Sequence, residues 1–192
     1  MNPLTNCKNI YFIGIGGIGM SALARYFNTQ GVVVSGYDKT PTLLTDALVE
    51  EGIQIHFEDD LAKIDKAATV IVYTPAIPNE HGELNYYRDN KYLVVKRSDV
   101  LQWITENAFT IAIAGTHGKT TTTSMTAHIL RHTGYGCNAF LGGIATNYGT
   151  NFWSHEKNVV VVEADEYDRS FLKLAPNIAV ITAVDPDHLD IY

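Results

Sequence analysis

Short apolar runs alternate along this chain with longer segments in which apolar residues recur every three or four positions. The apolar runs of the first half are residues 10–14, 32–37, 53–57, 69–74 and 92–95. The segments with helical spacing or helical end signals are 17–30, 42–51, 82–90 and 98–106. Strands that alternate with helices in this way predict an α/β fold, in which helices cover a parallel sheet.

The same alternation starts again near residue 109. It predicts a strand at 109–114, a glycine-rich turn, a helix at 120–132, and strands at 159–163 and 178–184. We therefore expect two domains, residues 1–107 and residues 108–192. Three strands and one helix are too few for a complete nucleotide-binding domain, so the sequence predicts a fragment of a longer protein.

Composition narrows the class of protein. Apolar residues make up 46% of the 192 residues and charged residues 18%, which is typical of a folded, soluble chain. The net charge of -7 argues against a general nucleic-acid binder, which needs a basic face. The sequence has neither a signal peptide nor an apolar stretch of about 20 residues that could span a membrane. Cys7 and Cys137 form no CxxC pair, so no zinc or disulfide framework is implied. A cytoplasmic protein without nucleic-acid or membrane partners is expected.

The first glycine-rich motif, GIGGIG at residues 14–19, follows the first strand and opens the first helix. Gly14 permits a tight turn, Gly16 lets a phosphate approach the backbone, and Gly19 lets the helix pack on the strand. Asp38 ends the second strand about 20 residues further on, where dinucleotide enzymes place an acid that binds a ribose. These features predict a Rossmann-like domain that binds a nucleotide, with NAD as the ligand that the motif alone suggests. A glycine-rich turn without a ligand is the alternative.

The second motif, AGTHGKTT at residues 114–121, again joins a strand to a helix. Its backbone N–H groups can surround phosphate oxygens, Lys119 can reach the β- and γ-phosphates, and Thr120 can bind Mg²⁺. The general P-loop pattern has an earlier glycine where this sequence has Ile113, so the loop is anchored at Gly115 instead. We interpret it as a variant ATP loop, which makes the second domain the beginning of a P-loop α/β ATPase domain.

Acidic residues follow the next two strands. Glu163 stands directly at a strand end, and ligands of open α/β sheets collect at that edge. A carboxylate there could complete the oxygen ligands of a Mg²⁺ ion next to Thr120. His188 follows the last strand and is a candidate for a metal ligand or for a hydrogen bond to phosphate. The alternatives are a solvated acidic loop and a structural histidine.

Several weaker signals remain open. The TPAIP turn at residues 74–78 could line a nucleoside pocket or only reverse the chain. Lys96 and Arg97 follow the fifth strand and could face an anionic ligand or be solvated. The pair His128 and His132 has HxxxH spacing but lacks the glutamate of a zinc-protease motif, so an ordinary surface or packing role is favoured over zinc.

Four segments together resemble the Mur ligase family. GTHGKTTTT is similar to the family's ATP loop, GTxGKT[TS], which lacks the early glycine. EADEYDRSF and DHLDIY are similar to the segments that follow the next two strands, and GIGGIGMSALA to the loop of the substrate domain. The motifs resemble the branch that joins L-alanine to UDP-N-acetylmuramate more than the branch of the murein tripeptide ligases. Tyr167, Arg169 and Ala183 depart from the usual residues.

The resemblance implies a Rossmann-like first domain that binds UDP-N-acetylmuramate rather than NAD. The residues implied for the UDP-sugar are Gly14, Gly16, Gly17, Ile18, Gly19, Asp38, Thr74, Ala76 and Ile77. Those implied for ATP are Gly115, Thr116, His117, Gly118, Lys119, Thr120 and Thr121. Mg²⁺ would be held by Thr120 and Glu163, which is preferred to Glu166 because it stands at the strand end, and a second metal by His188.

The resemblance also implies an ATP-dependent, amide-forming ligase of peptidoglycan precursor synthesis. The muramoyl carboxylate attacks the γ-phosphate to give an acyl phosphate, and the amine of L-alanine then displaces phosphate. Lys119 and His188 are the implied catalytic residues. The L-alanine site would lie largely outside this chain, so the fragment is expected to bind the UDP-sugar without turnover. A nicotinamide-dependent dehydrogenase would use only the first loop, a P-loop ATPase would use only the second, and a non-catalytic UDP-sugar-binding module is the third alternative.

Overall fold

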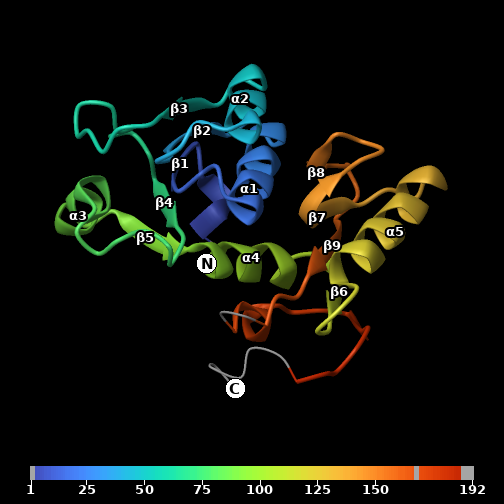
Figure 1. Ribbon diagram of the computed structural model, residues 1–192. Coiled ribbons are helices and arrows are strands. Elements are labelled where there is room, and N and C mark those ends of the chain that lie inside the picture. Colours follow the sequence, from blue (N-terminus) through green and yellow to red (C-terminus); the bar gives the residue numbers. More distant parts are fainter. Residues whose placement is uncertain (1–2, 167–168, 187–192) are drawn as a thin grey trace. The chain divides into compact units, whose positions relative to one another are not determined.

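A computed structural model describes residues 3–166 and 169–186 of the protein. The chain divides into two compact units, Met1–Val100 and Leu101–Tyr192 (Figure 1). Helix α4 (Arg97–Glu106) spans this division. The domain boundary expected after residue 107 stays a prediction.

The first unit is built on a five-stranded sheet with the strand order β3-β2-β1-β4-β5. Its strands are β1 (Asn9–Ile13), β2 (Val33–Tyr37), β3 (Gln54–His56), β4 (Val70–Tyr73) and β5 (Leu93–Lys96). Its helices are α1 (Ile18–Thr29), α2 (Leu43–Glu50) and α3 (Gly82–Asp89), after a short 3-10 turn η1 (Pro3–Asn6). All four strand pairs are parallel, which confirms the predicted Rossmann-like arrangement.

The core of the first unit explains why β1 is almost entirely apolar. Ile10, Tyr11, Phe12 and Ile13 are all 0% exposed, because helices cover both faces of the strand. Figure 1 shows α1 and α2 on one side of the sheet and α3 on the other. The sequence predicted a short apolar strand at residues 10–14.

A buried carboxylate lies within this core. Glu83 of α3 is 0% exposed, and its Oε2 accepts a hydrogen bond of 2.6 Å from the hydroxyl of Tyr11. Its Oε1 lies 2.8 Å from His56 Nε2 and accepts the backbone N–H of Asp60 at 3.1 Å. Burial and the neighbouring Glu83 raise the pKa of Tyr11. Because a buried charge is costly unless it is fully hydrogen-bonded, these contacts join β1, β3 and α3 into one network.

The second unit has a five-stranded sheet with the order β10-β6-β9-β7-β8. Its strands are β6 (Phe109–Ala114), β7 (Asn138–Ala145), β8 (Thr150–Trp153), β9 (Val159–Glu163) and β10 (Ile178–Ile181). Helix α5 (Lys119–His132) follows β6, and the 3-10 turn η2 (Ser170–Lys173) follows β9. β7 and β8 pair antiparallel, whereas the other pairs are parallel.

The sequence interpretation missed the β7–β8 hairpin and expected only three strands, so it was wrong about this part of the sheet. β7 contains Gly142 and Gly143, and its register with β8 shifts between Phe140 and Ala145. Glycine weakens a strand signal and often marks such an irregularity.

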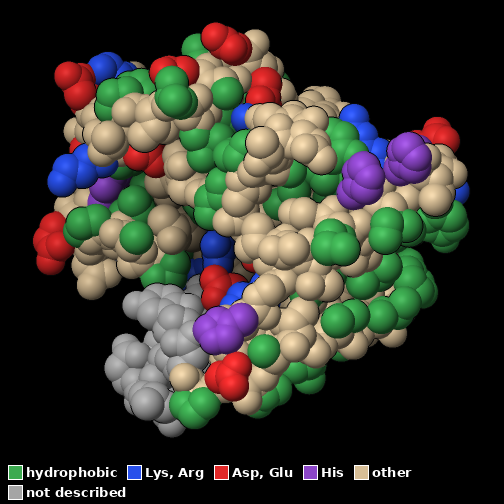
Figure 2. Space-filling view, turned by 45° about the vertical axis from the view of Figure 1, so that its right-hand side comes forward, with side chains coloured by type: hydrophobic (Ala, Val, Ile, Leu, Met, Phe, Trp, Pro, Cys, Tyr) green, Lys and Arg blue, Asp and Glu red, His purple; other side chains and the backbone are tan. Residues whose placement is uncertain are grey.

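β10 differs from the other parallel strands in its exposure. It ends at Ile181 rather than at the predicted residue 184, and Ile178 and Ile181 are 45% and 67% exposed. Hydrophobic side chains also reach the surface over much of the face shown in Figure 2. Among the described residues, no helix is both long and apolar enough to cross a membrane.

Candidate functional site

The first glycine-rich loop lies between the end of β1 and the start of α1. Gly14 has a φ of 87°, and the N–H groups of Gly14 and Ile15 both donate to the carbonyl of Tyr37, at 2.8 and 3.0 Å. Gly17 is the N-cap of α1 and provides no side-chain hydrogen bond. The N–H of Gly17 itself donates to the carbonyl of Gly14 at 3.3 Å. The loop thus leads into the N-terminal end of α1, and this end of a helix favours an anion.

Segments that follow β2 and β4 approach this loop closely. A Cβ added to Gly14 would lie 2.9 Å from Thr74 Cγ2, and one added to Gly16 would lie 2.8 Å from Asp38 Oδ2. The N–H of Gly16 donates to Asp38 Oδ2 at 2.7 Å. The predicted residues Asp38 and Thr74 are thus brought to the loop, and Gly16 has no room for a side chain.

The other predicted UDP-sugar residues lie around the same loop. Ile77 closes the turn after β4 by donating its N–H to the carbonyl of Thr74 at 3.1 Å, while Ala76 is exposed. Ile18 begins α1 and is 36% exposed. A Cβ added to Gly19 would lie 2.5 Å from Arg97 Nη1, so a guanidinium group stands beside the start of α1.

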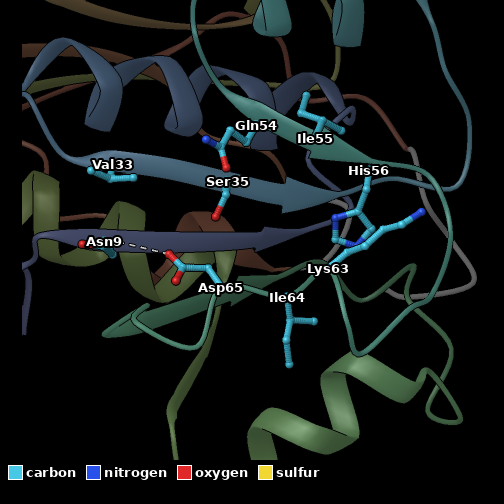
Figure 3. A pocket seen from close by; sticks show the side chains of 9 residues that line it. All are labelled: Asn9, Val33, Ser35, Gln54, Ile55, His56, Lys63, Ile64 and Asp65. Carbon is cyan, nitrogen blue, oxygen red and sulfur yellow. Dashed lines mark hydrogen bonds between the residues drawn. The ribbon is translucent and has the colours of Figure 1, made fainter.

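A separate cavity of about 530 Å³ lies over β2 and β3 (Figure 3). It is lined by Asn9, Val33, Ser35, Gln54, Ile55, His56, Lys63, Ile64 and Asp65. One amide hydrogen bond, from Asn9 Nδ2 to Asp65 Oδ2 at 3.1 Å, crosses it. None of the residues predicted to bind the UDP-sugar lines this cavity, so it is distinct from the loop.

The second glycine-rich loop also needs glycine for its backbone. Gly115 has a φ of 127° and Gly118, the N-cap of α5, has a φ of 80°, both in the region that favours glycine. Lys119 is the first residue of α5, and its Nζ donates to the carbonyl of Gly115 at 2.7 Å and to Glu166 Oε1 at 2.8 Å. The lysine side chain therefore folds back over its own loop.

Thr120 and Glu163 meet as the sequence predicted. The Thr120 hydroxyl donates to Glu163 Oε2 at 3.1 Å, and the N–H of Gly142 donates to Oε1 at 2.7 Å. A Cβ on Gly142 would clash with Glu163 Oε2, so the hairpin backbone fits closely against this carboxylate. Burial raises the pKa of Glu163, although the hydrogen bonds from Gly142 and Thr120 act in the opposite direction.

A hydroxyl and a carboxylate fit Mg²⁺, which prefers oxygen ligands and keeps several waters. Within residues 3–166 and 169–186, no group of three or more His, Cys, Asp and Glu side chains is arranged to hold a metal. A Mg²⁺ ion at Thr120 and Glu163 would therefore need phosphate oxygens and water to complete its shell. His188, the ligand predicted for a second metal, lies outside the described residues.

The remaining loop residues contact the segment after β10. The N–H of Thr116 donates to the carbonyl of Ala183 at 3.1 Å, and its hydroxyl accepts the N–H of Asp185 at 3.2 Å. His117 is exposed, with Nε2 3.9 Å from Asp185 Oδ2. Thr121 lines a cavity of about 400 Å³ between α5 and the β7–β8 hairpin.

The pair His128 and His132 has the ordinary contacts that the sequence favoured. Their rings lie 5.6 Å apart and nearly parallel, and His128 Nδ1 lies 2.6 Å from the hydroxyl of Tyr148. These contacts join α5 to the turn that connects β7 and β8, and they lie at the C-terminal end of α5, away from Lys119.

Two glycine-rich loops, each at a strand–helix junction of a largely parallel sheet, are typical of α/β proteins that bind nucleotides. The sequence matches the catalytic domain of the Mur ligase family over residues 9–109 and the Mur ligase middle domain over residues 113–192. The chain belongs to the Mur ligase family.

Curated relatives with similar sequences are named UDP-N-acetylmuramate–L-alanine ligase. The one from Porphyromonas gingivalis (strain ATCC BAA-308 / W83) is 56% identical over 191 residues, covering 96% of this chain and 42% of the relative. The one from Flavobacterium psychrophilum is 56% identical over 193 residues, covering 98% of this chain and 43% of the relative. The chain thus spans less than half the length of these relatives.

Solved structures show the same fold. UDP-N-acetylmuramate:L-alanyl-gamma-D-glutamyl-meso-diaminopimelate ligase from Neisseria meningitides aligns with a TM-score of 0.87 and 28% identity, over 96% of this chain and 63% of that chain. UDP-N-acetylmuramate-alanine ligase from Thermotoga maritima aligns with a TM-score of 0.86 and 33% identity, over 96% of this chain and 43% of that chain. The predicted fold class and family are confirmed.

The sequence interpretation overlooked or left open three residues near the loops. Arg97 was left undecided, although its position directly after a strand placed it at the correct edge of the sheet. Gly142 was overlooked because its hairpin was not predicted. The pairing of Glu166 with Lys119 has no local signal, since it joins residues 47 positions apart.

Proposed function

We propose that this chain carries the UDP-sugar-binding and ATP-binding parts of a ligase that joins L-alanine to the carboxylate of UDP-N-acetylmuramate in peptidoglycan precursor synthesis. One observation carries the proposal: Lys119, Thr120 and Glu163 converge on a glycine-rich loop in a chain 56% identical to ligases of that name. A cytoplasmic location is part of the proposal, because both proposed nucleotide substrates are cytoplasmic metabolites.

The first loop holds the UDP diphosphate in this proposal. The support is the position of the loop at the start of α1, since the N-terminal end of a helix favours an anion, together with the guanidinium group of Arg97 beside Gly19. Asp38 and the turn from Thr74 to Ile77, which includes Ala76, would lie near the ribose and the uracil ring. The N–H of Gly16 already binds Asp38, so its role is to fix this carboxylate beside the loop.

The second loop holds the ATP phosphates, with the backbone of residues 115–121 around them. Lys119 stabilises the charge that builds up on the transferred phosphoryl group. Thr120 and Glu163 would hold Mg²⁺, which supplies a positive charge that neutralises phosphate oxygens. His188 is retained as the proposed ligand of a second metal.

The proposed chemistry is acyl transfer through an acyl phosphate. A muramoyl carboxylate oxygen attacks the γ-phosphorus of ATP, and ADP leaves. The amine of L-alanine then attacks the acyl carbon, and inorganic phosphate leaves as the amide forms. The task of Lys119 in both steps is to balance negative charge on the phosphoryl oxygens, since positioning and electrostatics dominate phosphoryl transfer.

A second candidate within the same family uses a peptide amine in place of L-alanine. The observation that favours it is the TM-score of 0.87 with the ligase from Neisseria meningitides, whose name includes the peptide L-alanyl-gamma-D-glutamyl-meso-diaminopimelate. Both candidates use the same acid substrate, so they share every site residue proposed for this chain. They differ in the amine that the whole enzyme accepts.

The test of the proposed function is a calorimetric titration of this chain with UDP-N-acetylmuramate, and with NAD in parallel. We expect the UDP-sugar to bind and NAD not to bind. Gly16→Ala should abolish binding, because the added Cβ would lie 2.8 Å from both Asp38 Oδ2 and Thr45 Cγ2. Gly31→Ala, just after the other end of α1, is the control, because nothing lies within 4 Å of its added Cβ.

Two results would count against the proposed substrate. Binding of NAD alone would make the first unit a dinucleotide-binding domain. Binding of the UDP-sugar that survives Gly16→Ala would move its site away from the first loop.

A further inference from the structure

The ammonium group of Lys119 is shared between a loop carbonyl and a carboxylate. It donates to Gly115 O at 2.7 Å and to Glu166 Oε1 at 2.8 Å. The side chains of Lys119 and Glu166 are only 18% and 19% exposed. An ion pair shielded from water in this way is stronger than one at the surface, so the Glu166 carboxylate binds the Lys119 ammonium strongly.

The same ammonium group is the one that the phosphates need. An ammonium has three donors, and among the described residues Gly115 O and Glu166 Oε1 accept two of them. A triphosphate on this loop would bring several negative charges to Lys119, next to the carboxylate of Glu166. Like charges separated by a few ångströms repel strongly where water is partly excluded. The phosphate chain and Glu166 therefore compete for one cation.

Glu163 and Glu166 have separate contacts. Glu163 is held by the hydroxyl of Thr120 and the N–H of Gly142. Glu166 pairs with the lysine instead, and its carbonyl accepts the N–H of Arg169 at 3.0 Å, just before the turn η2. Glu163 is thus one of the oxygen ligands proposed for Mg²⁺, whereas Glu166 is hydrogen-bonded to the Lys119 ammonium.

We propose that Glu166 is a positioning residue that holds the Lys119 ammonium over the empty loop and gives it up to the phosphate chain of the incoming nucleotide. The inference rests on the proposed function, since it takes residues 115–121 to be a triphosphate site. Glu166 keeps the lysine ordered before binding and lowers the affinity for nucleotide, because its hydrogen bond must be replaced.

The experiment is a calorimetric titration of this chain with ATP, with and without Mg²⁺, and with ADP. The variants are Glu166→Gln and Glu156→Gln, an exposed glutamate of the same unit that gives the same change in net charge. Glu166→Gln should bind ATP about tenfold more tightly than the unmodified chain, with a smaller gain for ADP. Glu156→Gln should bind ATP like the unmodified chain.

Two further measurements distinguish a positioning role from a merely structural one. In a Lys119→Met background, the effect of Glu166→Gln on ATP affinity should differ from its effect in the unmodified chain, because the two residues share one contact. Equal effects in both backgrounds would mean that Glu166 acts on the phosphates by its charge alone and would contradict the positioning role. Hydrogen exchange of the backbone amides in η2 should be the same in Glu166→Gln and in the unmodified chain, because the N–H of Phe171 donates to the carbonyl of Asp165 rather than to the loop. A merely structural role for Glu166 would raise this exchange. Glu166→Asp keeps the charge on a shorter side chain, and its affinity should lie between those of the unmodified chain and Glu166→Gln.

The possible outcomes separate this inference from the proposed function. If the unmodified chain binds ATP and Glu166→Gln binds it equally or more weakly, the competition is wrong and the ATP loop stands. If neither binds ATP, the proposed ATP site is wrong, and the proposed role of Glu166 is wrong as well. If only Glu166→Gln binds, the competition is stronger than proposed and both ideas are supported.

Discussion

The two glycine-rich loops both connect a strand to a helix, but they differ in the charged groups around them. No residue of the first loop has a charged side chain, and Asp38 accepts a loop N–H directly at 2.7 Å. The second loop contributes its own cation, Lys119, and carboxylates contact side chains of the loop rather than its backbone. The first loop thus has backbone polar groups alone, whereas the second has a side-chain cation paired with a carboxylate.

This difference fits the two tasks that we propose for the loops. Rigid N–H groups at a helix start are suited to holding a diphosphate that does not react. A side-chain cation beside acidic groups is suited to phosphoryl transfer, in which negative charge moves during the reaction. Substitutions in the two units test this difference.

Lys119→Met should have the largest effect. It removes the only side-chain cation of the second loop, so we expect ATP affinity to fall about 100-fold while UDP-N-acetylmuramate affinity stays unchanged. Parallel titrations with both ligands measure this. Lys157→Met, which removes an exposed lysine of the same unit, is the control. A loss of both affinities would mean that the two loops do not act as separate sites.

Tyr11→Phe should lower the free energy of unfolding of the first unit. It removes the hydroxyl that donates to the buried Glu83 at 2.6 Å, and losing a hydrogen bond to a buried charge costs about 1.5–3 kcal/mol of unfolding free energy. Urea denaturation followed by circular dichroism measures it. Tyr92→Phe removes a solvent-exposed hydrogen bond to Lys66 O and should cost less than about 1 kcal/mol. If the two variants lost the same unfolding free energy, the buried hydrogen bond would be no more stabilising than the exposed one.

Gly142→Ala should disturb the second loop through the carboxylate of Glu163. The added Cβ clashes with Glu163 Oε2, so we expect the Mg²⁺-dependent part of ATP affinity to fall about tenfold. The neighbouring Gly143→Ala should change little, because its Cβ would meet Thr120 Cγ2 at an ordinary 3.5 Å. Titrations with and without Mg²⁺ measure this. Similar effects of the two variants would contradict a specific role for the Gly142 backbone.

Glu163→Gln should have the smallest effect. It should slightly change the stability of the chain in the absence of nucleotide. Burial raises the pKa of Glu163, so the folded state binds this proton more tightly than the unfolded state, and stability falls as the pH rises through the folded pKa. The variant should therefore melt about 1–2 °C higher than the unmodified chain near pH 7, and the gap should close near pH 4. Thermal melts at both pH values measure it. A gap that widens at low pH would reverse the sign of this argument.

The sequence predicted the features that depend on neighbours along the chain. Apolar runs indicated the strands, and glycine-rich motifs at strand ends indicated both loops. The β7–β8 hairpin was missed because Gly142 and Gly143 interrupt its pattern. The pairing of Lys119 with Glu166 was missed for another reason: which of two nearby acids meets the lysine depends on how the chain packs, and spacing carries no information about that.

The central position of β1 affects how the first unit folds during its synthesis. β1 is synthesised before the other four strands, yet it lies between β2 and β4, and Ile10 pairs with Val70 on its far side. A ribosome adds about 5–20 residues per second, so one edge of β1 stays unpaired for seconds after β2 has formed. Unpaired strand edges are where chains join their neighbours, so the first unit is most exposed to aggregation during its own synthesis.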